Sequence, residues 1–303
     1  MKVIYYTRNE WQQNTFSKNI ATEQLDLNEI VSLNDKLTHK EINDIYIPLV
    51  QFLTEKVKAE KSFMSFVKDH MLAKNQSIPF IIGITGGVSV GKSTMSRLLL
   101  ELMRSYNPNW KVELITTDGY IYPKKTLLER DLMSKKGFPE SYETNQLITD
   151  LKKIKSGEEN VPTYTYSHLT YDRLQDAYHF INQPDVLIIE GVNIFQTNNY
   201  SEELVSDYLD YKIYLDAEIE QMKQWYVQRF FKLQSEAFQN KQSHFYQYKD
   251  LSYEETQHLA LDIWQSINEI NIKENIMPTR KRADLVLHKG HNHEIDHLHF
   301  QKI

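Results

Sequence analysis

The stretch GITGGVSVGKST, residues 83–94, carries the spacing of a phosphate-binding loop, Gly86-x-x-x-x-Gly91-Lys92-Ser93. The glycines let successive backbone N–H groups turn toward one anion, and the following helix directs its positive end to the same point. Lys92 adds a charge for the outer phosphates, and Ser93 offers a hydroxyl to Mg²⁺. We therefore expect ATP and Mg²⁺ as cofactors. The predicted cradle comprises Gly86, Gly87, Val88, Ser89, Val90, Gly91, Lys92, Ser93 and Thr94.

Two carboxylates follow apolar runs elsewhere in the chain. Glu190 follows four apolar residues in DVLIIEG and is expected to hold Mg²⁺ directly or through a water molecule. Asp118 lies in LITTDGY, where it could accept a hydroxyl proton as the γ-phosphoryl group moves to that oxygen. Each has a plainer structural interpretation as a turn or capping carboxylate. A base at Asp118 is what would distinguish a phosphotransferase from a nucleotide switch.

Five short apolar runs must position these groups. Runs without polar alternation are buried on both faces, and the helical patterns between them imply crossover connections and a mostly parallel sheet covered by helices. The first run precedes the phosphate loop and a helix opens at Lys92, which is the context that makes the loop specific. The runs span residues 79–84, 112–116, 186–189, 211–215 and 285–287.

Residues 1–77 are expected to form a helical extension without strands, packed on a core of residues 78–303 within one domain. Thr38-x-x-Glu41 predicts a helix start, and Pro48 predicts a kink shortly after it.

Two polar, tyrosine-rich insertions, residues 119–145 and 159–180, are candidate walls for a substrate, because ligands of open α/β folds bind beyond the carboxyl ends of the strands. Between residues 217 and 270, two helical patterns flank a polar bridge at 239–243, which predicts a lid or a surface loop.

The composition of the 303 residues narrows the class of protein. A formal charge of -6 argues against nucleic acid as a partner. The absence of cysteine removes disulfides and thiolate sites and is typical of a reducing compartment, so we expect a cytoplasmic protein. No apolar stretch approaches the roughly 18 residues of a spanning helix, and the N-terminus lacks the apolar core of a signal peptide, so we expect an unprocessed protein without a membrane partner.

Beyond the loop, the chain resembles the bacterial type I pantothenate kinases, in the phosphoribulokinase and uridine kinase branch of the phosphate-loop fold. The similarity covers nearly the whole chain and implies a three-layer P-loop NTPase-type fold with a mostly parallel sheet. The motifs that carry it are IYIPL (45–49), GGVSVGKST, ELITTDGY, KKGFPESY (135–142), YSHLTYD (166–172), PDVLIIEGVN, WYVQRF (225–230) and NIMPTR (275–280).

The resemblance implies an ATP:pantothenate 4′-phosphotransferase of coenzyme A biosynthesis. In it Asp118 is the base for the pantothenate hydroxyl, Lys92 and Ser93 hold phosphate and Mg²⁺, and Arg229 stabilises the moving phosphoryl group. The residues implied around pantothenate are Tyr166, His168, Tyr171, Tyr226 and Asn268. By residue type alone, His168 could be a structural histidine, Arg229 a surface ion pair, and Tyr226 with Phe230 ordinary core.

The family also implies a homodimer and feedback inhibition by coenzyme A at the nucleotide site. The implied contacts are Lys92, Arg97, His168, Phe238 and Phe245. Leu233 stands where an aromatic residue is expected in the pocket for the thiol end, so the strength of this inhibition is open. The alternatives to a pantothenate kinase are a uridine kinase-like or phosphoribulokinase-like enzyme and a non-catalytic, nucleotide-regulated binding protein.

Five histidines gather near the C-terminus and could suggest a metal site. The alternation in HNHEIDHLHF predicts instead an edge strand with histidines on solvated positions. The histidines are His288, His291, His293, His297 and His299.

Overall fold

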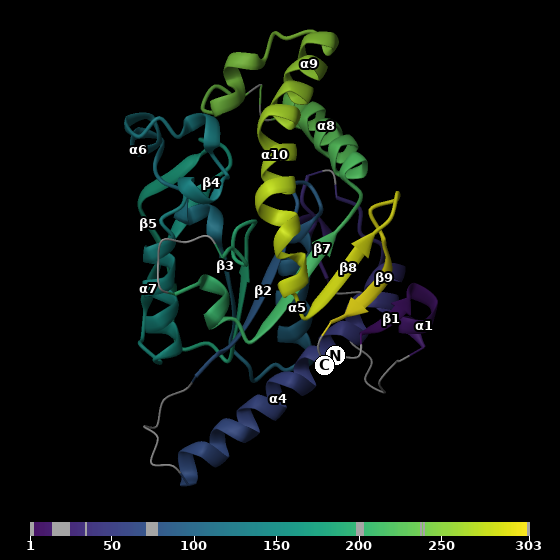
Figure 1. The fold of residues 1–303 in the computed structure, drawn as a ribbon, viewed down its shortest axis with the longest axis vertical. Coiled ribbons are helices and arrows are strands. Elements are labelled where there is room, and N and C mark those ends of the chain that lie inside the picture. The colour runs from purple at the N-terminus through teal and green to yellow at the C-terminus, as the bar shows by residue number, and fades with distance from the viewer. Residues whose placement is uncertain are drawn as a thin grey trace.

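The computed structural model describes residues 3–13, 25–33, 35–70, 78–197, 203–236, 238 and 240–301. Their main sheet has the strand order β1-β9-β8-β7-β2-β6-β3 (Figure 1). The strands are β1 (Ile4–Thr7), β2 (Phe80–Gly86), β3 (Val112–Thr116), β6 (Val186–Glu190), β7 (Tyr211–Asp216), β8 (Leu285–Lys289) and β9 (Ile295–Phe300). Parallel pairing joins β3, β6, β2, β7 and β8, which confirms the five predicted runs and the mostly parallel sheet.

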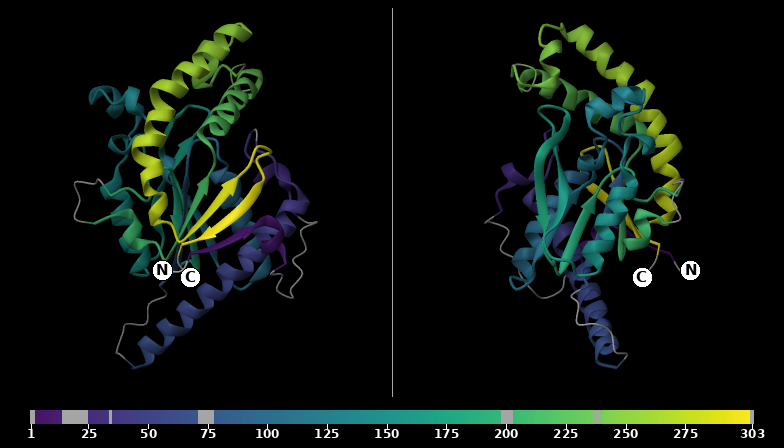
Figure 2. Two further views of the ribbon diagram at one scale, coloured as in Figure 1. Left: turned by 45° about the vertical axis from the view of Figure 1, so that its right-hand side comes forward. Right: turned by 90° about the vertical axis from the view of Figure 1, so that its left-hand side faces the viewer.

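Burial explains why these strands lack polar alternation. Every residue of β2 and β6 is buried, because helices cover both faces of the sheet at its centre. In Figures 1 and 2, α10 and its continuations cover one face while α4 and α5 cover the other. The helices are α1 (Arg8–Gln12), α2 (Leu27–Ile30), α3 (His39–Glu41), α4 (Ile47–His70), α5 (Lys92–Tyr106), α6 (Lys124–Glu129), α7 (Thr144–Lys155), α8 (Ile219–Glu236), α9 (Tyr253–Ile263) and α10 (Glu269–Asn271).

Several short helical turns complete these elements. The 3₁₀ turn η3 (Thr117–Tyr120) follows β3, and the π-helical turn η9 (Trp264–Asn268) joins α9 to α10. Further turns continue α10 as far as Arg282, just before β8. The two predicted helical patterns between 217 and 270 are therefore confirmed as α8 and α9. Gln239, in the predicted bridge, lies outside the described residues.

The N-terminal region is mainly helical, as predicted, but it contains a strand that we did not predict. β1 pairs antiparallel with β9, so the beginning and the end of the described chain meet at one edge of the sheet. The pattern was missed because only one face of this four-residue strand is partly buried. Helix α3 starts at Thr38 as predicted, although the Glu41 carboxylate accepts a hydrogen bond from the Ile295 N–H (2.9 Å) in β9.

Two further details correct the predicted elements. The irregularity expected at Pro48 is a π-helical turn at Ile42–Tyr46, just before that proline. The C-terminal histidine-rich segment is not an edge strand, since β9 lies between β8 and β1. Among the described residues, no helix combines the length and apolar composition needed to cross a bilayer.

The second predicted insertion, residues 159–180, folds as a twisted hairpin of β4 (Val161–Ser167) and β5 (Asp172–Ile181). Figure 2 shows this hairpin standing beside the main sheet. It packs against η3, so one wall of the candidate site is carried directly on the turn that holds Asp118.

Candidate active site

The phosphate loop connects the buried end of β2 to the first turn of α5, as the sequence predicted. Gly91 has φ of +93°, in the left-handed region that favours glycine. Gly86 has φ of +151°, and a Cβ there would lie 2.3 Å from the Leu215 carbonyl oxygen in β7. Only glycine allows β7 to approach the loop this closely. The backbone therefore holds the N-terminus of α5 open toward an anion.

Lys92 lies within the loop, where its Nζ donates to the Gly87 carbonyl oxygen at 2.7 Å. Burial lowers the pKa of Lys92, while the negative charges of Glu190 and Asp118 oppose that shift. The positive charge of Arg229 adds to the lowering. Three predicted site residues from three separate elements are thus close enough to influence the Lys92 ammonium group.

Ser93 and Glu190 form a pair across α5 and β6, with Ser93 Oγ donating to Glu190 Oε1 at 3.0 Å. Burial raises the pKa of Glu190, and the nearby Lys92 charge acts in the opposite direction. A hydroxyl and a carboxylate side by side are the hard oxygen ligands that suit Mg²⁺. The residues predicted to hold this ion therefore fit it.

Asp118 lies in η3, two residues beyond the end of β3, and is half-buried. Thr116 and Glu190 are register partners in neighbouring parallel strands, so the two carboxylates leave the sheet at the same edge. The charge of Asp118 raises the pKa of Glu190 on the phosphate side and opposes the lowering, by burial, of the pKa of His168 in the hairpin. Asp118 therefore faces both sides of the site.

The hairpin supplies three of the predicted residues around an acceptor. The Tyr166 ring lies 5.3 Å from that of His168 and 6.2 Å from that of Tyr171, between ring centroids. Burial raises the pKa of Tyr166 and of Tyr171, and the negative charge of Asp118 raises both further. Tyr171 has φ of +54°, a conformation uncommon for an aromatic residue. This strained backbone presents its side chain toward the site.

Tyr226 of α8 and Asn268 of η9 are the other two residues predicted around the acceptor, and they belong to elements outside the hairpin. Their side chains are hydrogen-bonded to each other, which joins α8 to η9. Burial raises the pKa of Tyr226, and the neighbouring Tyr171 raises it further. The effect of Tyr171 on Tyr226 shows that the two walls, the hairpin and the α8–η9 pair, approach each other.

Comparison with known proteins confirms the family that the sequence motifs predicted. The family model of the phosphoribulokinase/uridine kinase family matches residues 81–233. Curated proteins named pantothenate kinase match almost the whole chain: that of Listeria monocytogenes is 41% identical and covers 99% of this chain and 98% of its own length. The pantothenate kinase of Halalkalibacterium halodurans is 40% identical and covers 98% of this chain and 95% of its own length. That of Actinobacillus succinogenes is 39% identical and covers 99% of this chain and 94% of its own length. This chain belongs to the pantothenate kinase family.

Solved structures support the fold alone. D-glycerate 3-kinase from Cryptococcus neoformans has a TM-score of 0.52 at 15% identity and covers 82% of this chain and 97% of its own. A putative fructose transport system kinase from Silicibacter has a TM-score of 0.52 at 18% identity, covering 66% and 86%. The predicted family and the P-loop kinase fold are therefore both confirmed.

In this pantothenate kinase family member, the N-terminal region reaches the phosphate loop, which we did not predict. The Ser32 N–H donates to Thr94 Oγ1 at 2.9 Å, and Thr94 Oγ1 donates to the Asp35 carboxylate. Arg97 donates to the Ile30 carbonyl oxygen at 2.9 Å and to Ser32 Oγ at 2.6 Å. The extension thus closes one side of the cradle, and no motif in it signals that role.

His293 is a second residue that we missed as part of the site. It lines a cavity over the phosphate loop together with Lys92, Arg229 and Trp225, and only 4% of its surface is exposed. Its ring centroid lies 3.7 Å from that of Trp225, and neither ring nitrogen has a hydrogen-bond partner among the described residues. Burial lowers the pKa of His293 to about 3. Its Nδ1 lies 3.7 Å from Asp35 Oδ1, so this imidazole, neutral at pH 7, sits beside the loop and the N-terminal region that closes it.

Lys136 is the third missed residue, although it belongs to the KKGFPESY motif. Its Nζ donates to the Tyr171 carbonyl oxygen at 2.5 Å and lies 3.7 Å from the centroid of the Tyr171 ring. Burial lowers the pKa of Lys136 to about 8, against the opposing charges of Asp172 and Asp118. The motif indicated this segment, but only the folded loop shows that Lys136, and not the adjacent Lys135, contacts Tyr171.

The aromatic residues predicted for a thiol end lie beyond Tyr171. Phe245 is 5.3 Å from Tyr171 and 5.3 Å from Phe238, between ring centroids. Phe238 is fully buried and lies 5.6 Å from Phe230 of α8. Leu233 packs against this same cluster, in the position where an aromatic residue was expected. Ring contacts thus run without a gap from Tyr171 in the hairpin through Phe245 and Phe238 to α8, and we call this set the aromatic surface.

Proposed function

We propose that this protein transfers the γ-phosphoryl group of ATP to the hydroxyl of pantothenate and forms 4′-phosphopantothenate, an early step of coenzyme A biosynthesis. The observation that carries the proposal is the position of Asp118. Its charge acts on Glu190 beside the phosphate loop and on His168 in the hairpin, which supports a role for Asp118 between a phosphate donor and a polar acceptor. A nucleotide switch has no need of that second wall.

The transfer is a direct in-line displacement. The pantothenate hydroxyl oxygen forms a bond to the γ-phosphorus, the bond from that phosphorus to the bridging oxygen breaks, and ADP leaves. Asp118 takes the hydroxyl proton. Lys92 and Arg229 hold the charge that spreads over the phosphoryl oxygens, and Arg229 does so with a planar fork of donors. Ser93 and Glu190 would hold Mg²⁺, which would supply further neutralisation of the phosphate charge.

Pantothenate is a small acid with amide and hydroxyl groups, and the acceptor wall offers matching partners. Tyr166, His168 and Tyr171 from the hairpin, with Tyr226 and Asn268 opposite, provide directed donors and acceptors on aromatic walls. Lys136 Nζ lies 5.3 Å and 3.7 Å from the ring centroids of Tyr166 and Tyr171 and would bind the carboxylate of the substrate. His293 and the cavity beside it would receive the rest of the nucleotide.

Feedback by coenzyme A is a further part of the proposal. Lys92, Arg97 and His168 would bind its phosphates and base in place of ATP, and Phe238 with Phe245 would receive the thiol end. The joined aromatic surface supports this assignment, because it leads from the acceptor wall into the Phe238 cluster. Leu233 removes one ring from that cluster.

We also propose a cytoplasmic homodimer, as the family implies, with residues 1–77 as an extension of the 78–303 core within one domain. The contacts of Ser32 and Asp35 with the phosphate loop support counting the extension as part of that domain.

The test is a substrate panel with purified protein, MgATP and pantothenate, uridine or ribulose 5-phosphate, with ADP release measured enzymatically. We expect ADP release that depends on pantothenate alone, and a product that mass spectrometry identifies as phosphopantothenate. Release with uridine or ribulose 5-phosphate only would assign the protein to another branch of the family. Repeating the assay with added coenzyme A tests regulation separately from substrate identity.

A further inference from the structure

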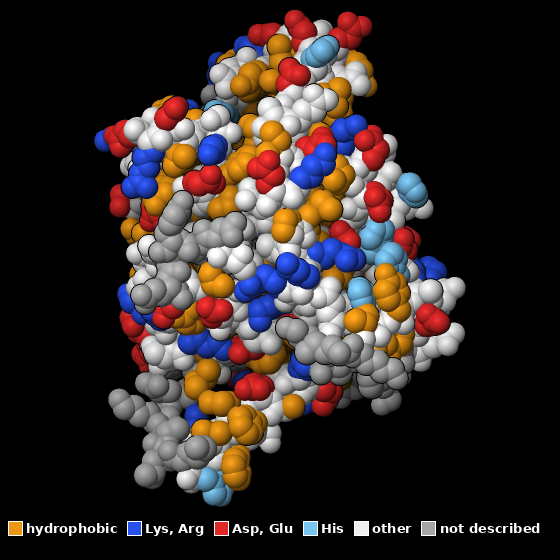
Figure 3. Space-filling view, in the orientation of Figure 1, with side chains coloured by type: hydrophobic (Ala, Val, Ile, Leu, Met, Phe, Trp, Pro, Cys, Tyr) orange, Lys and Arg blue, Asp and Glu red, His pale blue; other side chains and the backbone are white. Residues whose placement is uncertain are grey.

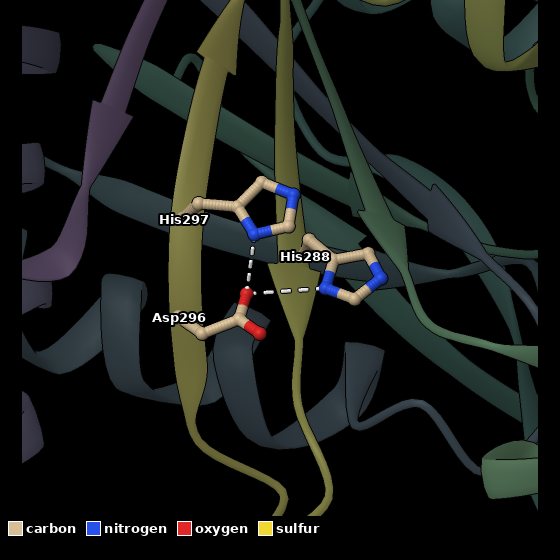
Figure 4. A group of neighbouring side chains, drawn as sticks. All are labelled: His288, Asp296 and His297. Atoms are coloured by element: carbon tan, nitrogen blue, oxygen red, sulfur yellow. Dashed lines mark hydrogen bonds and ion pairs between the residues drawn. The ribbon is translucent and has the colours of Figure 1, made fainter.

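A cluster of two histidines and an aspartate lies on the β8–β9 hairpin, outside the residues assigned to the kinase site. His288 Nδ1 lies 3.1 Å from Asp296 Oδ1, and His297 Nδ1 lies 2.6 Å from the same oxygen. Figure 4 shows both imidazole rings directing this nitrogen at the one carboxylate. We propose that His288, Asp296 and His297 bind a divalent transition-metal cation of the Zn²⁺ class.

The backbone brings the three side chains to one side of the sheet by an irregularity. Asp296 and His297 are adjacent in β9, and adjacent residues of a regular strand point to opposite faces. The pairing of β8 and β9 shifts register at this point, because His288 pairs with His297 whereas Lys289 pairs with Ile295. Asp296 is the extra residue of this bulge. A bulge re-aims the side chain it carries, which places the carboxylate beside both histidines.

The ligand types select the cation. Imidazole nitrogens with one carboxylate oxygen suit Zn²⁺ and its neighbours, whereas Mg²⁺ and Ca²⁺ prefer oxygen ligands alone. The three candidate ligand atoms all lie within 4.8 Å of one another. Zinc bonds of about 2.1 Å at tetrahedral angles place two ligand atoms about 3.4 Å apart. Small side-chain rotations would widen the distances from Asp296 Oδ1 to the two imidazole nitrogens to that value.

Charge and access also favour a cation. Two imidazole nitrogens and a carboxylate oxygen can all ligate a cation, and a bound cation would neutralise the carboxylate charge. The side chains of His288, His297 and Asp296 are 17%, 29% and 50% exposed, so an ion can reach them. In Figure 3 pale-blue histidine side chains gather on the surface over this hairpin.

The neighbouring residues hold the ligands in place. The rings of His288 and His297 stack at 4.4 Å between centroids, and Tyr5 of β1 stacks on His297 at 5.6 Å. A Cβ at Gly290 would lie 3.0 Å from Asp296 Oδ2, so the carboxylate packs against a residue without a side chain. A metal here would tie β8 to β9 at the base of the turn that carries His293. The proposal does not depend on the kinase activity.

Metal binding is tested on the untagged, full-length protein after treatment with a chelator. Excess MgCl₂ occupies the oxygen ligands of the kinase site, and Zn²⁺ binding is measured by equilibrium dialysis. The chain has no cysteine, so no thiolate competes for the ion. We expect about one tight Zn²⁺ per chain, and characteristic visible absorption when Co²⁺ replaces it.

The variants are His288→Gln with His297→Gln, and separately Asp296→Asn, which keeps the shape of the aspartate. We expect the double variant to weaken Zn²⁺ binding by more than about 100-fold, since even outer-shell partners of a metal are worth about 10–100-fold. His258→Gln, an exposed histidine on α9, is the matched control and should bind as the unchanged protein does.

Zn²⁺ should also raise the melting temperature of the unchanged protein and of the control, but not of the double variant. Circular dichroism checks that each variant is folded, and Asp296→Asn repeats the test if the double variant is not. Equal Zn²⁺ binding by the unchanged protein and a folded cluster variant would overturn the proposal. An equal loss in His258→Gln would do the same.

Discussion

The phosphate cradle and the proposed acceptor wall are built in opposite ways, and the charge of Asp118 acts on residues of both. The cradle comes mainly from one continuous stretch, residues 86–94, whose shape depends on two glycines and the start of α5. The wall takes side chains from the 135–142 loop, the β4–β5 hairpin, α8 and η9. A local backbone motif holds any triphosphate. Only the assembled wall can choose the acceptor, so changes on the two sides should alter different kinetic constants.

The largest effect should come from the boundary between the two regions. Asp118→Asn keeps the shape but removes the proton acceptor, so kcat should fall by about 10²–10⁴-fold while ATP affinity stays within about twofold. Steady-state kinetics measures kcat, and titration with nucleotide measures the affinity for ATP. Asp176→Asn in the β4–β5 hairpin, an exposed site whose positive φ asparagine tolerates, is the control. Full activity of Asp118→Asn would refute the base role, and an equal loss of ATP binding would make Asp118 a structural group.

A smaller loss is expected on the donor side. Arg229→Lys keeps the charge but loses the planar fork of donors, so kcat should fall by about 10–100-fold with little change in the KM for pantothenate. The exposed Arg130→Lys is the matched control. A rise in the KM for pantothenate without a change in kcat would instead place Arg229 in the acceptor wall.

The acceptor wall should respond to pH through Lys136. Its pKa is lowered to about 8 by burial, so it is a cation below that pH and becomes neutral above it. If it binds the pantothenate carboxylate, kcat/KM for pantothenate should fall as pH rises through about 8, since this ratio reports the free enzyme. Lys136→Met should lower the ratio about tenfold at pH 7 and flatten that part of the profile.

Lys125→Met, whose side chain is 87% exposed in the unchanged protein, is the control for that profile. An unchanged profile in Lys136→Met would show that another group titrates. An equal effect on the KM for ATP would place Lys136 at the donor instead.

The smallest effect concerns the aromatic surface that both ligands share. Leu233→Phe adds a ring to the Phe238 cluster, so inhibition by coenzyme A should strengthen by about three- to tenfold while the KM for pantothenate changes less. Inhibition curves at fixed ATP measure it. Leu128→Phe, at an exposed site on α6, is the control. Weaker inhibition would show that the cluster is already filled.

Patterns that act over a few residues were predictable. The loop, the five buried strands and the carboxylates at the ends of β3 and β6 all follow from short-range spacing, because buried parallel strands leave a plain apolar signature. β1 and the position of β9 inside the sheet, one strand from its edge, were not predictable, since a short, half-exposed strand is defined by its partner. His293 and Lys136 escaped for a related reason: burial, not residue type, makes them exceptional.

By itself, the sequence determined that a triphosphate binds, and its motifs determined which family the chain belongs to. Both conclusions depend on residues close together in the sequence, so they can be read without the folded structure. Tertiary structure alone decided that the N-terminal region closes the cradle and that Lys136 lies beside Tyr171. It also decided that a bulge turns Asp296 toward two histidines. The physical reason is that these arrangements depend on contacts between distant segments, and no spacing along the chain encodes such contacts.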